Sequence, residues 1–257
     1  MRLHHVLDGP ADAPVAVLAS SLGTTHEMWE PQIGSLSERF RVVRYDRRGH
    51  GRSPVVDGPT TLDDLGADIV ELLDELGLER VSFCGLSLGG LEAMWLALNR
   101  PERVERLVLA CTAASFSPRE TWVERAALVR ANGVRAIAEA VLARWFRPVF
   151  HDTHSGVVTR FGAMLASTPP EGYAACCDVL ADADLTGRLG AIAAPTLVIT
   201  GAEDPAVPPA AGEALAAAIP EAAHVVVEGA AHIANVEQPD LVTAALLRHL
   251  GPVGKGA

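Results

Sequence analysis

Short apolar runs alternate with longer amphipathic stretches along the first 110 residues of the chain. The apolar runs are rich in Val and Leu, with aromatic and other β-favouring residues between them, which is typical of buried strands. The expected strands are residues 15–19, 41–45, 81–84 and 104–110. Alternation of such strands with helices favours a mainly parallel sheet with helices on both faces, an α/β fold.

Two of the intervening stretches carry helix signals. Thr61-Leu62-Asp63-Asp64 resembles a capping box, which satisfies free backbone N–H groups at the start of a helix. The leucines and the isoleucine of residues 62–76 fall on one helical face, and Gly77 is placed to end that helix. Residues 88–99 are rich in Leu, Ala and Met and stop before Pro101, so a second helix is expected there.

The pattern changes over residues 115–188, where strand-like runs are replaced by amphipathic stretches. Residues 122–132 and 136–146 predict two helices, which Gly133 separates and Pro148 closes. A helical stretch of this kind between strands indicates a cap inserted into the sheet domain.

Strand character returns at residues 195–200 and 224–227, an alanine-rich helix lies between them near residues 210–218, and a last helix is expected over residues 240–250. The chain is therefore predicted to form one core that the cap interrupts. The predicted organisation is a first core part at residues 1–115, a helical cap at residues 116–188 and a second core part at residues 189–257.

Composition narrows the class of protein. The chain has 257 residues, 49% of them hydrophobic, which is enough for one large core, but it lacks the run of about 18 apolar residues that a membrane helix needs. A formal net charge of -11, with Lys255 as the single lysine, argues against a nucleic-acid partner, since phosphate binding needs clustered Lys and Arg. Residues 1–5 have no signal-peptide core, so a cytoplasmic protein is expected.

A glycine-flanked serine lies between an expected strand and an expected helix. Gly85-Leu86-Ser87-Leu88-Gly89 follows the run at residues 81–84 and opens the helix at residues 88–99. This order is typical of a nucleophile elbow, a strained turn that small flanking residues tolerate and that exposes the serine hydroxyl at the edge of a sheet. Ser87 is therefore the candidate nucleophile.

A serine nucleophile needs a histidine base, and the base needs a carboxylate that orients it. Asp204 follows the expected strand at residues 195–200, and His232 follows the one at residues 224–227, so both lie in loops at the sheet edge that carries Ser87. The order Ser, Asp, His is the order of the α/β-hydrolase triad. Glu203 is the nearest competitor for the acid, but the residue just before Pro205 fits the loop better.

Acyl transfer also needs two N–H donors for the oxyanion. The residue after the nucleophile, Leu88, is expected to supply one. The other is expected from the loop after an early strand, residues 20–25, where Gly23 allows close approach and Leu22 is the candidate donor. Many α/β-hydrolases have His-Gly where this chain has Ser20-Ser21.

The remaining histidines and the cysteines predict no metal site. His50 is expected to shape its loop, and Asp46 to bind loop backbone. His151 and His154 are three residues apart but lack a third ligand. The cysteines follow no metal-ligand spacing and are expected to be reduced and buried; they are Cys84, Cys111, Cys176 and Cys177.

Several segments resemble the 3-oxoadipate enol-lactonases of the β-ketoadipate pathway of aromatic catabolism, and the similarity extends over nearly the whole chain. They are Ser21-Leu22-Gly23-Thr24, Tyr45-Asp46-Arg47-Arg48-Gly49-His50-Gly51, Gly85-Leu86-Ser87-Leu88-Gly89-Gly90, Arg144-Trp145-Phe146, residues 167–173 and Asn235-Val236-Glu237-Gln238-Pro239. The resemblance implies an α/β-hydrolase fold with a helical cap. It also implies a carboxylic ester hydrolase that needs no cofactor and that opens a small anionic lactone to 3-oxoadipate through an acyl-enzyme.

A carboxylate-bearing substrate needs a local cation in a strongly acidic protein. Residues 119–147 contain six arginines against three glutamates. Arg125 lies three residues after Trp122, on one helical face, and Arg144 adjoins Trp145. These two pairs are the candidate substrate-binding residues. The alternative interpretation is that the arginines are solvated and that the tryptophans belong to the core of the cap.

Other functions share these features. A different small-ester or lactone carboxylesterase, or a cofactor-free perhydrolase, would use the same triad and oxyanion hole. A hydrolase-fold receptor would keep the pocket and turn its ligand over slowly. A dehalogenase or an epoxide hydrolase would need an aspartate in place of Ser87, so these two classes are disfavoured.

Overall fold

A seven-stranded sheet forms the centre of the computed structural model, which describes residues 1–251. The strand order is β1-β3-β2-β4-β5-β6-β7, and every neighbouring pair is parallel except β1 with β3. The strands are β1 (His5–Asp8), β2 (Val15–Ala19), β3 (Arg41–Tyr45), β4 (Val81–Leu86), β5 (Val104–Ala110), β6 (Thr196–Gly201) and β7 (Ala223–Val227). The mainly parallel sheet confirms the predicted α/β fold.

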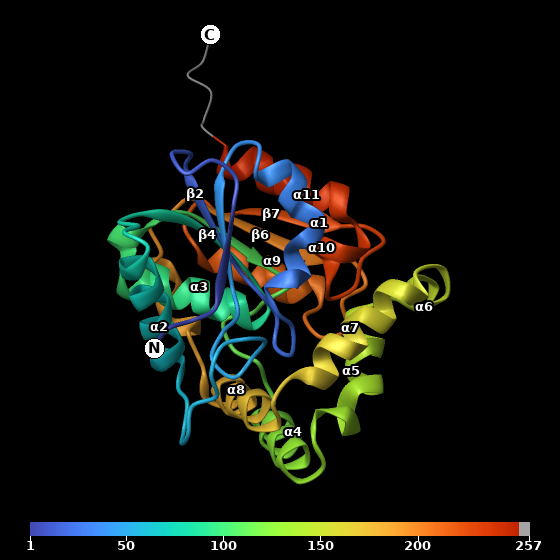
Figure 1. Ribbon diagram of the computed structural model, residues 1–257. Helices are drawn as coiled ribbons and strands as arrows, with labels where there is room; N and C mark the ends of the chain where they lie inside the picture. Colours follow the sequence, from blue (N-terminus) through green and yellow to red (C-terminus); the bar gives the residue numbers. More distant parts are fainter. Residues whose placement is uncertain (252–257) are drawn as a thin grey trace.

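Helices cover both faces of this sheet, and Figure 1 shows α1 and α11 together on one side with α2 and α3 on the other. The α-helices are α1 (Glu30–Leu36), α2 (Leu62–Glu75), α3 (Leu88–Asn99), α4 (Arg119–Asn132), α5 (Ala138–Trp145), α6 (Pro148–Thr153), α7 (Ser155–Ser167), α8 (Pro170–Asp182), α9 (Pro209–Ala218), α10 (Ala234–Glu237) and α11 (Pro239–Leu250). Short 3-10 turns are η1 (His26–Trp29), η2 (Pro101–Arg103), η3 (Val134–Ile137) and η4 (Thr186–Ala191). None of the helices within residues 1–251 has both the length and the apolar character needed to cross a membrane.

Local signals place α2 and α3 where they were expected. The Thr61 side chain accepts the Asp64 N–H while Asp64 accepts the Thr61 N–H, so the predicted capping box is present. Gly77 follows the helix with φ +66°, a left-handed conformation that favours glycine. The α3 helix buries almost its whole length, and this anchors Ser87, the residue just before its first turn.

The predicted helical insertion is confirmed between β5 and β6, and we call helices α4 to α8 the cap. Figure 1 shows them gathered at one end of the sheet, where α4 packs along α8 and α5 packs on α7. An isolated antiparallel bridge between Ser115 and Asp184 joins the two ends of the insertion. The limits at residues 116–188 stay a prediction, and residues 252–257 of the second core part lie outside the described residues.

The cap differs from the expectation in detail. The first helix begins at Arg119, and residues 134–137 form a 3-10 turn before α5. Pro148 is the first residue of α6 and does not close the preceding helix. A proline is tolerated at this position because the backbone N–H that it lacks would have no partner within the helix. Strand β1, which was not expected, is a short antiparallel edge strand with a weak apolar pattern.

Candidate active site

Ser87 occupies a strained turn between β4 and α3. Its backbone has φ 58° and ψ -118°, and its carbonyl accepts a hydrogen bond from the Thr112 hydroxyl at 2.7 Å. A Cβ at Gly85 would lie 1.9 Å from the Gly89 carbonyl oxygen, and one at Gly89 would lie 2.5 Å from the Ala19 oxygen. The turn therefore requires both glycines, as the elbow pattern predicts.

Asp204 and His232 meet in the loops after β6 and β7. The two side chains are buried, and His232 Nδ1 lies 2.8 Å from Asp204 Oδ2. The other oxygen of Asp204 accepts the N–H groups of Ala206 at 2.8 Å and Val207 at 2.9 Å. The carboxylate is thereby fixed, so it can hold the imidazole in one orientation with Nε2 free for a serine hydroxyl.

Glu203, the competing acid, points elsewhere. Its side chain is 56% exposed and lies 3.1 Å from the Arg147 guanidinium. The geometry therefore favours Asp204 over Glu203 as the partner of His232.

The loop after β2 brings Leu22 beside Ser87. Both line one cavity of about 380 Å³, together with Ser21 and His232. The backbone N–H groups of Leu22 and Leu88 have no hydrogen-bond partner within residues 1–251, whereas the neighbouring Gly23 N–H donates to His50 Nε2 at 3.1 Å. Two free amides near the serine are the arrangement that an oxyanion hole requires.

Arg47 fixes the loop that carries Leu22. Its buried guanidinium donates to the carbonyl of Ser20 at 2.6 Å and to that of Ser21 at 3.0 Å. It also forms an ion pair with buried Glu92, at 2.8 Å, and Glu92 accepts the Tyr45 hydroxyl at 2.8 Å. Burial and the Glu92 charge together raise the pKa of Tyr45 well above its usual value, so the phenol is a hydrogen-bond donor.

His50 completes the support of this loop. Its Nδ1 lies 3.2 Å from the Arg48 carbonyl and its Nε2 accepts the Gly23 N–H, which fixes a neutral tautomer. Burial, together with the charge of Arg47, lowers the pKa of His50 to about 3. The expectation that His50 shapes a loop agrees with these contacts. The roles of Arg47 and Glu92 were not expected, although the Tyr45–Gly51 motif was the signal that could have pointed to Arg47.

The cap closes the cavity over Ser87. All four candidate substrate-binding residues line it: Trp122, Arg125, Arg144 and Trp145. The Arg125 guanidinium lies 4.5 Å from the centre of the Trp122 ring, a cation–π distance. The cavity thus has a nucleophile on its core side and arginines beside aromatic rings on its cap side.

The cavity is positively charged, although the whole chain has a formal net charge of -11. Neither Arg125 nor Arg144 forms an ion pair within residues 1–251, whereas the cap residues Arg119, Arg130 and Arg147 all do. None of the described residues that line the cavity is acidic. Two uncompensated guanidinium groups in a partly enclosed space favour an anionic ligand.

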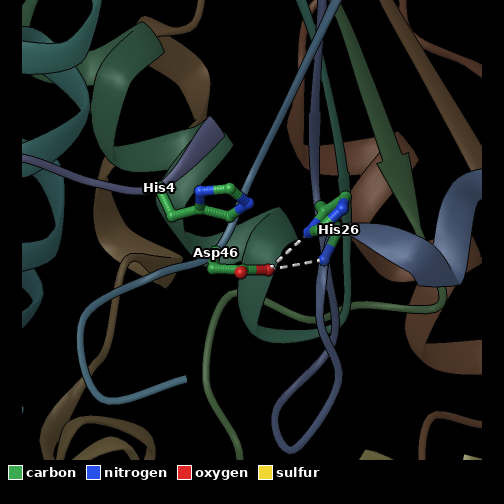
Figure 2. Close-up of side chains that lie close together, drawn as sticks. All are labelled: His4, His26 and Asp46. Carbon is green, nitrogen blue, oxygen red and sulfur yellow. Dashed lines mark hydrogen bonds and ion pairs between the residues drawn. The ribbon is translucent and has the colours of Figure 1, made fainter. Parts of the chain in front are cut away.

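One group of three potential metal ligands occurs outside the cavity, within residues 1–251. Figure 2 shows His4, His26 and Asp46 side by side. Their potential ligand atoms all lie within 4.8 Å of one another. The Asp46 carboxylate already accepts the backbone N–H groups of His26 at 2.8 Å and Arg52 at 3.0 Å, and the His26 imidazole lies 2.9 Å away. Burial alone would raise the pKa of Asp46, but these bonds lower it. Internal hydrogen bonding explains the group, and we assign no metal to it.

Comparison with known proteins identifies the family. The sequence profile of the alpha/beta hydrolase fold matches residues 14–239. A 3-oxoadipate enol-lactonase of Acinetobacter baylyi is 41% identical over 239 residues, which cover 93% of this chain and 89% of the relative. A protein assigned as the carbamate hydrolase RutD of Variovorax paradoxus is 37% identical over 214 residues, which cover 81% of this chain and 80% of the relative.

Solved structures agree with this result. The enol-lactonase from Burkholderia xenovorans LB400 superposes with a TM-score of 0.95 at 42% identity, covering 96% of both chains. A hydrolase from Pseudomonas aeruginosa superposes with a TM-score of 0.94 at 45% identity, covering 97% of this chain and 94% of the other. The chain therefore belongs to the α/β-hydrolase family, as a member similar to the 3-oxoadipate enol-lactonases.

Proposed function

We propose that this protein opens 3-oxoadipate enol-lactone to 3-oxoadipate through an acyl-enzyme on Ser87. Similarity to enol-lactonases at about 40% identity over nearly the whole chain supports the substrate class. The observation that carries the proposal is the cavity itself, in which Ser87 and His232 face two arginines without acidic partners. A small lactone with one carboxylate matches that distribution of charge.

Acylation begins when His232 Nε2 takes the proton of the Ser87 hydroxyl and the oxygen attacks the lactone carbonyl. The N–H groups of Leu22 and Leu88 stabilise the oxyanion, and Asp204 stabilises the charged imidazole. The carbonyl is restored as the ring C–O bond breaks, and the leaving enol oxygen takes the proton from His232. An enol is a better leaving group than an alkoxide, so this step needs less help from an acid.

Deacylation uses the same groups, with water in place of Ser87 as the nucleophile. His232 removes a proton from water, which attacks the acyl carbonyl; the bond to the Ser87 oxygen then breaks, and this oxygen takes the proton back from His232. The enol product then tautomerises to the 3-oxo acid. Because the substrate carboxylate does not react, its contact with Arg125 or Arg144 serves to orient the lactone carbonyl over the serine.

The carboxylate contact makes a testable difference between substrates. We expect the wild-type protein to prefer the enol-lactone over its methyl ester, whose neutral group cannot pair with a guanidinium. Arg144→Gln and Arg125→Gln should each reduce kcat/KM for the acid by about 10- to 100-fold, the value of a charge-assisted hydrogen bond. The same changes should leave kcat/KM for the methyl ester nearly unchanged. The measurement is the ultraviolet absorbance decay of each lactone.

Arg119→Ala is the matched control, because Arg119 is an exposed cap arginine paired with Asp182. If neither glutamine variant changed the ratio between acid and ester, the proposed carboxylate contact would be wrong.

The RutD relative supports carbamate hydrolysis as a second candidate, since a carbamate anion also suits a cationic cavity. Release of ammonia from carbamate, without loss of the enol-lactone, would favour that candidate.

A further inference from the structure

The segment that joins α5 to α6 lies against the loop of His232. The Ile233 N–H donates to the Trp145 carbonyl at 3.0 Å. Trp145 lines the substrate cavity, and the residue after His232 is thus tied directly to the cap. This contact is one of several that converge on the same loop.

Glu237 makes the second contact, from the short helix α10. Its carboxylate is fully buried, and Oε2 accepts the N–H of Ala231, the residue before His232, at 2.5 Å. Oε1 accepts the backbone N–H of Arg147 at 3.0 Å. One carboxylate therefore bridges the histidine loop and the α5–α6 junction, and the amides on both sides of His232 are held in place.

Arg147 extends this bridge to the loop of Asp204. Its guanidinium lies 3.4 Å from Glu237 and 3.1 Å from Glu203, the residue next to Asp204. The backbone N–H of Glu203 in turn donates to the Ala230 carbonyl at 2.9 Å. The two loops of the His–Asp pair are thus joined to each other and to one cap residue.

We infer that Glu237, on α10, and Arg147, in the cap, are positioning residues that together set the orientation of His232. This inference rests on the proposed function of Ser87 and His232. Neither side chain lines the cavity, so neither contacts substrate. Their effect is on the imidazole, because moving a general base by about 1 Å can reduce the rate about 100-fold. Arg147, one of the six arginines of residues 119–147, is thereby assigned to the His–Asp pair and not to the ligand.

Glu237→Gln tests the inference with little change in shape. The amide keeps one acceptor oxygen but turns a donor toward one of the two backbone N–H groups. We expect kcat for the enol-lactone to fall by about 10- to 100-fold while KM stays within about threefold, since the cavity wall is intact. Arg147→Ala keeps its own backbone N–H, so it should lower kcat by about 3- to 10-fold. It also provides a second variant if Glu237→Gln does not fold.

An uncharged fluorophosphonate gives a readout that does not depend on the lactone. It modifies a serine only as fast as the histidine activates that serine, and its rate is corrected for the folded fraction by near-ultraviolet circular dichroism. We expect labelling of Glu237→Gln to be at least tenfold slower than wild type and that of Arg119→Ala to be unchanged. Equal labelling rates in wild type, Glu237→Gln and Arg147→Ala would overturn this inference alone. A wild-type protein that the probe does not label would overturn the proposed nucleophile, and this inference with it.

Discussion

His50 shows how single side chains are held in this protein. It is buried beside Arg47 and accepts the Gly23 N–H with a nitrogen that must stay unprotonated. Burial disfavours the charged imidazole, and protonation would also place a second cation next to the Arg47 guanidinium, so the pKa of His50 falls to about 3. The loop that carries Leu22 thus depends on one neutral imidazole.

This pKa predicts how stability varies with pH. The unfolded chain protonates His50 below about pH 6.5, whereas the folded protein does not do so until about pH 3, so the free energy of unfolding decreases as the pH falls between these values. The loss is up to about 1.4 kcal/mol per pH unit. Urea unfolding at pH 7.5 and pH 5 should show it. His50→Gln keeps an acceptor for Gly23 and does not titrate, so its loss should be smaller by about 2 kcal/mol. Equal losses in both proteins would contradict this account of His50.

Among the helices and strands, those that depend on interactions between residues close in the chain were predicted, and those that depend on contacts between distant segments were not. Strands β2, β3 and β5 and helices α2 and α3 were predicted because apolar runs, a capping box and a proline are local signals. Strand β1 escaped prediction because its stability comes from pairing with β3, not from its own apolar pattern. Helices α6 to α8 also escaped prediction as separate helices; α7 and α8 place Leu165 and Tyr173 against Gly23 of the loop after β2, a contact between segments far apart in the chain.

The candidate site likewise contains residues that the sequence pattern predicts and supporting contacts that it does not. Ser87, Asp204 and His232 were found because each follows an expected strand, and parallel strands end at one edge of a sheet. The contacts of Arg47 with Ser20 and Ser21, and of Glu237 with Ala231 and Arg147, join distant or irregular segments. No pattern along the chain predicts such pairs, so only the structure shows that these side chains support the site.

For the whole molecule, the fit between cap and core decides the shape of the cavity. Besides the Glu237 contacts, the two parts meet where Gly172 of α8 lies on Gly49 of the loop after β3. Gly49 has φ +70°, and a Cβ on it would lie 2.4 Å from the Gly172 Cα. The cap therefore rests on the core backbone itself, close to the loop that His50 and Arg47 hold.

Gly172→Ala should disturb this fit, because its Cβ would lie 2.1 Å from the Gly49 carbonyl oxygen. Neither backbone can give way cheaply, so we expect a loss of about 1–3 kcal/mol in stability and a rise in KM as the cap moves away from Ser87. Gly156→Ala is the matched control, because nothing lies within 4 Å of its Cβ in the exposed part of α7. Urea unfolding and lactone kinetics measure both effects. A Gly172→Ala protein as stable as wild type, with an unchanged KM, would show that this contact does not position the cap.

The most direct measurement is the ultraviolet absorbance decay of freshly generated 3-oxoadipate enol-lactone with wild-type protein and with Ser87→Ala, beside a simple p-nitrophenyl ester. We expect fast loss of the lactone with wild type, weak activity on the ester, and a decrease of at least about 1,000-fold in lactone turnover for Ser87→Ala. Slow lactone loss with fast ester cleavage would contradict the substrate. Lactone turnover that survives in Ser87→Ala would contradict the nucleophile.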